Sequence, residues 1–148
     1  MGGHPYWYFV KHEPDLDAVL ESLREREFKA GRYNPAIPFP EFPVTAKSPS
    51  PGARHDSIDE ALESSGEEGT RSILDIARIS DEPDFCAASP VDEDSLEALY
   101  GTAAPTRAQV EADLDPLFDL ADRGQAAYVV LFESGHPSEV LFIGYSFD

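Results

Sequence analysis

The sequence predicts an α+β fold, in which a small, mostly antiparallel sheet of three or four strands has about four helices packed on it. Two observations predict this class: apolar runs typical of strands lie at both ends of the chain, and the segments between them have apolar residues at helical spacing. With 148 residues, of which 41% are hydrophobic, the chain is long enough to bury a core. We therefore expect residues 1–148 to form a single domain.

The expected strands come from unbroken apolar runs. Residues 6–10 read YWYFV, and large and β-branched side chains are typical of a strand that is covered on both faces. Near the C-terminus, two apolar runs flank SGHPS, whose glycine and proline suit a hairpin turn. A free edge on the last strand would invite aggregation, so the first strand is its expected partner. The strands are thus expected near 5–11, 126–133 and 139–147, and isoleucines make 72–79 a candidate fourth, although its length also suits two helical turns.

Two helices are expected in the first half of the chain. The first lies between Pro14 and Gly31, because leucine and valine residues recur three or four positions apart and acidic residues occupy its first turn. Gly31 is the expected C-terminal stop. In the second helix, Ser57 and Glu60 form a capping-box pattern, and Gly66 ends the helix.

Two more helices are expected in the second half. Ser89 is the expected cap of a helix that has Pro90 in its first position and continues to residue 101. The last helix covers 106–124. Pro116 cannot donate a backbone hydrogen bond, so this helix should kink there or restart with Asp115 as a new cap.

Residues 34–52 are expected to form an extended, proline-rich loop. Six prolines fall between residues 35 and 51, and each one disfavours the helical conformation in the residue before it. Because Phe39 and Phe42 would each contribute about 1.5–3 kcal/mol when buried, we expect the first half of the loop to cover the core. A partner-binding strip or the wall of a ligand site are the alternatives. A mobile connector is expected near 64–70, which contains SSGEEG.

The charge is the unusual feature of the composition. There are 29 acidic and 11 basic residues, and the net charge of −18 disfavours both nucleic acid and anionic membrane surfaces as partners. A basic protein partner would explain this acidity, and so would adaptation to a cytoplasm rich in salt. The acidic residues are spread along the chain, which favours the second explanation. No apolar run could span a bilayer and no signal-peptide pattern is visible, so the expected location is cytoplasmic.

The first functional hypothesis is a non-enzymatic acidic domain that binds protein, as an inhibitor or immunity-type partner of a basic protein. Complementary fields accelerate association by about 10–10³-fold, and salt weakens the effect. The contact would be made by acidic residues of the third and fourth expected helices: Asp92, Glu93, Asp94, Glu97, Glu111, Asp113 and Asp115.

The alternative hypothesis is a small-molecule enzyme or ligand-binding domain with an anion site near Arg32, Tyr33 and Asn34, joined by His12. Four basic residues lie between positions 24 and 32, where pairing with nearby glutamates would also account for them. Arg32 differs, because it follows Gly31 and has no role in the helix. A third hypothesis is a structural homo-oligomeric subunit, in which a homodimer forms through the edge of the C-terminal strand.

Catalytic residues, a metal and a cofactor are not expected. The chain has no nucleophile-elbow, phosphate-loop or zinc-protease motif. His4 and His12 would lie about 27 Å apart along an extended strand, too far to chelate together. Cys86 has no neighbouring basic group to activate it, so a structural thiol is the expected role. An enzyme is therefore the less favoured class.

Overall fold

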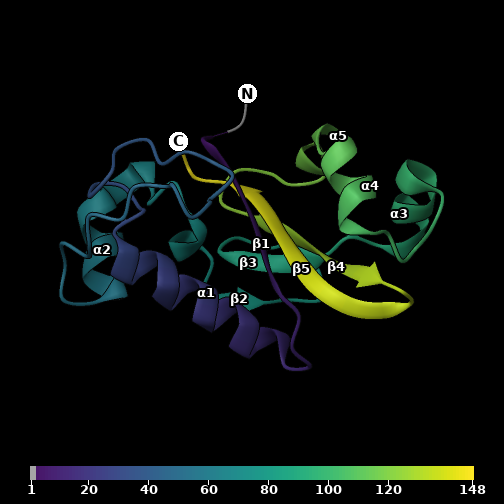
Figure 1. The fold of residues 1–148 in the computed structure, drawn as a ribbon. Helices are drawn as coiled ribbons and strands as arrows, with labels where there is room; N and C mark the ends of the chain where they lie inside the picture. Colours follow the sequence, from purple (N-terminus) through teal and green to yellow (C-terminus); the bar gives the residue numbers. More distant parts are fainter. Residues whose placement is uncertain (1–2) are drawn as a thin grey trace.

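A five-stranded mixed sheet lies between two groups of helices in the computed structural model, which describes residues 3–148 (Figure 1). In Figure 1, α1 and α2 lie on one side of the sheet and α3, α4 and α5 on the other. In chain order the elements are β1 (Pro5–Lys11), α1 (Leu16–Ala30), α2 (Ile58–Ser65), the 3₁₀ turns η1 (Gly66–Glu68) and η2 (Ile73–Asp75), β2 (Arg78–Ile79), β3 (Ala87–Pro90), α3 (Glu93–Tyr100), α4 (Arg107–Ala112), α5 (Asp115–Phe118), β4 (Ala126–Glu133) and β5 (His136–Tyr145).

The expected fold class is wrong in its sheet. The strand order is β1-β5-β4-β3-β2, and the sheet is mixed: β5 is antiparallel to β1 and β4, whereas β3 is parallel to both β4 and β2. Parallel neighbours need a long crossover, and the segment with α3, α4 and α5 supplies it between β3 and β4. The described chain therefore has a five-stranded mixed sheet and five α-helices, in place of three or four mostly antiparallel strands and about four helices.

The strand β3 was expected to be a helix start. Ala87–Pro90 consists of small residues with low strand propensity, but the segment pairs with β2 on one side and β4 on the other, so tertiary contacts override propensity. Ser89 is buried in this strand, and Asp92 caps α3 by accepting a hydrogen bond from the Ser95 amide. Serine followed by proline is thus a strand end here, and the helix begins one turn later.

The candidate strand at 72–79 is also mostly wrong. Ile73–Asp75 is a 3₁₀ turn capped by the Ser72 side chain, and only Arg78–Ile79 pairs in the sheet. Ile73, Leu74 and Ile76 are fully buried, so the isoleucines fill the core from a turn. Their strand propensity reflects burial, which a packed turn provides equally well.

Local capping signals placed most helix ends correctly. Gly31 ends α1 in the left-handed conformation, at φ 75°, and the side chain of Ser57 caps α2. The expected helix over 106–124 is two short helices. It restarts at Pro116 as one alternative proposed, but Leu114 stands at the cap and Asp115 is the first helical residue.

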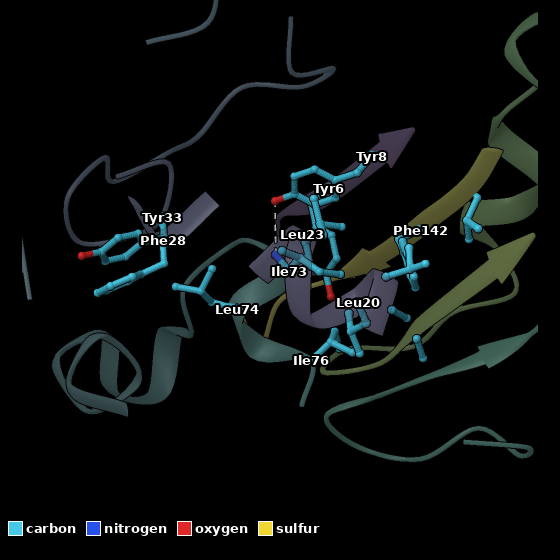
Figure 2. Packing of buried hydrophobic residues seen from close by; sticks show 14 of the residues in the cluster. Tyr6, Tyr8, Leu20, Leu23, Phe28, Tyr33, Ile73, Leu74, Ile76 and Phe142 are labelled. Carbon is cyan, nitrogen blue, oxygen red and sulfur yellow. Dashed lines mark hydrogen bonds between the residues drawn. The ribbon is translucent and has the colours of Figure 1, made fainter. Parts of the chain in front are cut away.

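Both faces of the sheet are covered, because successive residues of a strand point to opposite faces. On β1, Tyr6 and Tyr8 pack with α1 and η2 in one cluster, and Trp7 and Phe9 pack with the α3–α5 side in another. Figure 2 shows part of the first cluster, in which Tyr6 and Tyr8 of β1 are joined by Leu20 and Leu23 of α1 and by Ile76. Within residues 3–148, no helix is long and apolar enough to cross a membrane.

The C-terminal strand has no free edge. Val140 of β5 lies opposite Val10 of β1 on one side and Val130 of β4 on the other. The expected pairing with the first strand is confirmed, and the strand begins at His136 after a tight turn instead of at 139. Both edges of β5 are occupied within the chain, so a homodimer through the edge of this strand, as in the third hypothesis, would have to displace β1 or β4.

The proline-rich loop crosses the molecule without helix or strand between residues 34 and 52. Phe42 packs against β1, with ring-to-ring distances of 5.8 Å to Trp7 and 5.2 Å to Tyr8. Phe39 was expected to be buried in the same way, but 64% of its surface is exposed. The connector near 64–70 contains the end of α2 and η1, and it leads to Thr70, which is fully buried.

Two buried tyrosines on β1 give a matched stability test. The Tyr8 hydroxyl accepts a hydrogen bond from the Ile73 amide at 3.2 Å, drawn as a dashed line in Figure 2, whereas the buried Tyr6 hydroxyl has no partner. We expect Tyr8→Phe to lower the free energy of unfolding by about 1–3 kcal/mol, because it leaves a buried amide unpaired. Tyr6→Phe should be neutral or stabilising, since it removes an unpaired hydroxyl.

Urea unfolding followed by circular dichroism measures both variants. If both variants lose the same free energy of unfolding, either the hydrogen bond to Tyr8 does not stabilise the fold, or a bound water pairs with the Tyr6 hydroxyl.

Candidate functional site

The candidate site is a cleft at the outer edge of β1, which we call the arginine cleft. It has a volume of about 560 Å³, and both helical layers contribute to it: Arg26 from α1 and Arg107 from α4. Tyr8 and Phe9, which point to opposite faces of the sheet, both line it, so the cleft wraps around this edge strand. The lining residues are Tyr8, Phe9, Arg26, Arg32, Pro43, Val44, Thr45, Ala46, Ser48, Ser50, Arg107 and Glu111.

A buried glutamate holds two of the three arginines. The Glu27 side chain is fully buried, and its carboxylate accepts hydrogen bonds from Arg32 Nε and Nη2 and from Arg26 Nε, each at 2.8 Å. The paired bonds to Arg32 form a bidentate contact, which fixes the guanidinium plane. Hydrogen bonding to Glu27 raises the pKa of Arg32, so its positive charge is secure. The α1 sequence places Glu27 on the buried stripe with Leu20 and Leu23, where an unpaired carboxylate would be very unfavourable.

The third arginine comes from the opposite layer. Arg107 donates to Glu111 one turn along α4 at 2.7 Å and to Glu139 of β5 at 2.9 Å, and its guanidinium lies 4.2 Å from the centre of the Phe9 ring. These contacts hold the guanidinium at the wall of the cleft. The Arg107 side chain remains 46% exposed, and that of Arg26 48%.

The lining of the cleft is rich in cationic side chains compared with the chain as a whole. Three arginines and one glutamate line it, while the surface as a whole carries the net charge of −18. Glu27 and Glu139 also contact these arginines, so together with Glu111 three carboxylates balance the formal charge of the three guanidinium groups. Arg26 uses only Nε on Glu27, so its two terminal nitrogens are available as donors to a bound molecule. Hydroxyl groups of Thr45, Ser48 and Ser50 on the loop add donors and acceptors.

Of the expected ligand-binding residues, only Arg32 lines the cleft. Tyr33 is fully buried, stacks on Phe28 at 5.8 Å and bonds His55 through its hydroxyl, so it supports the core. Asn34 is buried, and its side-chain amide donates to the carbonyl of Gly69 at 2.9 Å. His12 follows β1, and its backbone amide donates to Ser138. The structure does not bring these three side chains into the cleft with Arg32.

Sequence reasoning missed the contribution of α4. Arg107 is one of only two basic residues between 91 and 123, and an isolated arginine in an acidic segment was a signal that could have drawn attention to it. Arg26 belonged to the basic cluster between 24 and 32, but its pairing with Glu27 could not be separated from ordinary helix-surface pairing.

The seven acidic residues expected to bind protein are all exposed, and they lie in or beside α3, α4 and α5. Two of them have local partners: Asp92 caps α3, and Glu111 pairs with Arg107. The remaining five side chains are exposed to solvent. All seven acidic residues therefore lie in the same helical layer.

A second group of polar atoms is buried on the other side of the sheet. Asp75 accepts two hydrogen bonds from Thr70 on Oδ1, while its Oδ2 is buried without a partner. Burial raises the pKa of Asp75. Its protonated form therefore stabilises the fold at low pH, and that contribution is lost as the pH rises through the raised pKa. Cys86 is nearby and half-buried, and burial also raises the pKa of its thiol, which disfavours the reactive thiolate.

Comparisons with known proteins add nothing to this picture. No protein-family model, curated protein or solved structure matches the chain. Within residues 3–148, no group of three or more histidine, cysteine, aspartate or glutamate side chains is arranged to hold a metal ion.

Proposed function

We propose that this chain is a binding protein for a small anionic ligand, which it holds in the arginine cleft. The observation that supports the proposal is the convergence of Arg26, Arg32 and Arg107 on one cavity in a chain of net charge −18. Guanidinium groups match carboxylate and phosphate oxygens through paired hydrogen bonds. A volume of about 560 Å³ suits a small molecule.

The first hypothesis from the sequence was a basic protein partner. We prefer a small anion as the ligand because of the cleft. Arg26 and Arg32 are already oriented by Glu27, and Arg107 is oriented by Glu111 and Glu139. Little side-chain entropy is therefore lost when an anion binds.

A cytoplasmic location is also part of the proposal, and fractionation of the source cells tests it.

Calorimetric titration with inorganic phosphate at low ionic strength tests the proposed function. We expect a dissociation constant on the order of 1 mM. Arg107→Ala should weaken binding about tenfold, because a hydrogen bond to a charged group contributes about 1.5–3 kcal/mol.

The matched control is Arg78→Ala. Arg78 is 49% exposed, pairs with Asp84 and does not line the cleft. This variant therefore changes the net charge by the same amount and removes one exposed ion pair, whereas Arg107→Ala removes two. It should bind phosphate within twofold of the unmodified chain. Equal weakening by the two substitutions would mean that only net charge matters, and absence of binding would overturn the proposal.

A basic protein partner is the second candidate, favoured by the exposure of all seven expected acidic residues in one helical layer. Neutralising Glu93, Asp94 and Glu97 together leaves the Asp92 cap intact. Association with polyarginine that weakens with salt and with this triple substitution would support the candidate, and association that is indifferent to both would contradict it.

A further inference from the structure

The arginine cleft has a smaller, apolar neighbour, which we call the apolar pocket. It has a volume of about 210 Å³ and is formed by both halves of the proline-rich loop together with Arg32. Ile37, Phe39 and Phe42 are among its lining residues, and Glu41 is the carboxylate among them. Arg32, Val44 and Ser48 line both cavities and so form their common rim. Arg32 therefore lies at the boundary between the polar arginine cleft and the apolar pocket.

The position of Phe39 is maintained by a buried cation. The Arg71 side chain is only 7% exposed, its guanidinium lies 4.3 Å from the centre of the Phe39 ring, and its Nη1 donates to the carbonyl of Pro38 at 2.6 Å. These contacts fix the loop at Pro38 and Phe39, while 64% of the Phe39 surface stays exposed. Phe39 is thus both exposed and part of the pocket wall, so its ring is available to contact a bound molecule.

We infer that the ligand is an organic anion with an aromatic or branched apolar group. This inference rests on the proposed function and adds the chemical class of the ligand. The carboxylate or phosphate lies against Arg32 at the common rim, and the apolar group enters the pocket beside Phe39. A simple inorganic anion has no hydrocarbon to place in the apolar pocket. The pocket therefore provides selectivity among anions by removing hydrocarbon surface from water.

Two pairs of probes with identical head groups test this inference by calorimetry on the full chain. Methyl phosphate is compared with phenyl phosphate, and acetate with benzoate. In at least one pair, we expect the aromatic member to bind about tenfold more tightly. The pair that shows the preference identifies the head group as phosphate or carboxylate.

Phe39→Ser should abolish the preference for the aromatic probe, so that the two members of the pair bind with similar affinity. Phe85→Ser is the matched control, because Phe85 is 62% exposed and lies outside both cavities, and it should keep the preference. Equal binding of the paired probes, or a preference that survives Phe39→Ser, overturns the apolar pocket while leaving the anion site in place. Absence of binding by all four probes overturns the proposed function as well.

Discussion

Glu27→Gln is expected to lower the free energy of unfolding by about 3–5 kcal/mol, because it leaves two arginines without their carboxylate. Glu27 is fully buried and bonds both Arg26 and Arg32 at 2.8 Å. The Arg32 side chain is itself only 13% exposed, so water cannot fully replace the lost partner. A change of this size is a large part of the stability of a domain of this length.

Urea unfolding measures the effect, and Glu25→Gln in the same helix is the control. Glu25 is half exposed and lies 3.7 Å from Lys29, so its removal should cost about 0.5 kcal/mol or less. If both substitutions lower the free energy of unfolding by the same small amount, Glu27 does not hold Arg26 and Arg32 in place. The cleft would then lose its main structural support.

Gly31→Ala is expected to lower the free energy of unfolding by about 3 kcal/mol or more. Gly31 has a φ of 75°, where an added Cβ is unfavourable by about 1–2 kcal/mol. That Cβ would also overlap the carbonyl of Gly52, at the end of the proline-rich loop. The Gly52 amide donates to Ala30 at 2.9 Å, so the clash would push the loop off the end of α1.

Gly101→Ala separates the two causes, because Gly101 ends α3 at nearly the same φ of 76° and has open space where a Cβ would be. We expect it to cost only the conformational part, about 1–2 kcal/mol. Thermal or urea unfolding of both variants gives the difference. If both variants lose the same free energy of unfolding, the loop moves away from the added Cβ at no cost, and its contact with Gly31 does not stabilise the fold.

The elements that the sequence predicted well depend on near neighbours along the chain. The apolar run of β1, the glycine that ends α1 and the serine that caps α2 each act within one or two turns. The hairpin of β4 and β5 likewise joins two adjacent apolar runs. Such signals can be read directly because the residues that interact are close in sequence.

The elements that it missed are short and depend on distant partners. The strand β3 is stabilised by parallel pairing with β4, which follows three helices later, and β2 pairs over two residues only. Nothing in Ala87–Pro90 itself favours a strand. Pairing supplied by the rest of the sheet overrides the helix-start pattern of serine and proline there.

The candidate site shows the same division. Arg32 was recognised because it follows the helix stop at Gly31, although the expectation that it has no role in the helix is wrong, since it pairs with Glu27 of α1. Arg107 and Phe9 reach the cleft only because α4 and β1 meet there. By itself, the sequence determined the acidity, the positions of most helices, the first strand and the terminal hairpin. The tertiary structure alone decided the mixed sheet, the strand β3 and the convergence of three arginines. The reason is that periodicity and caps act locally, whereas strand pairing and clefts arise from contacts between segments that are far apart in the chain.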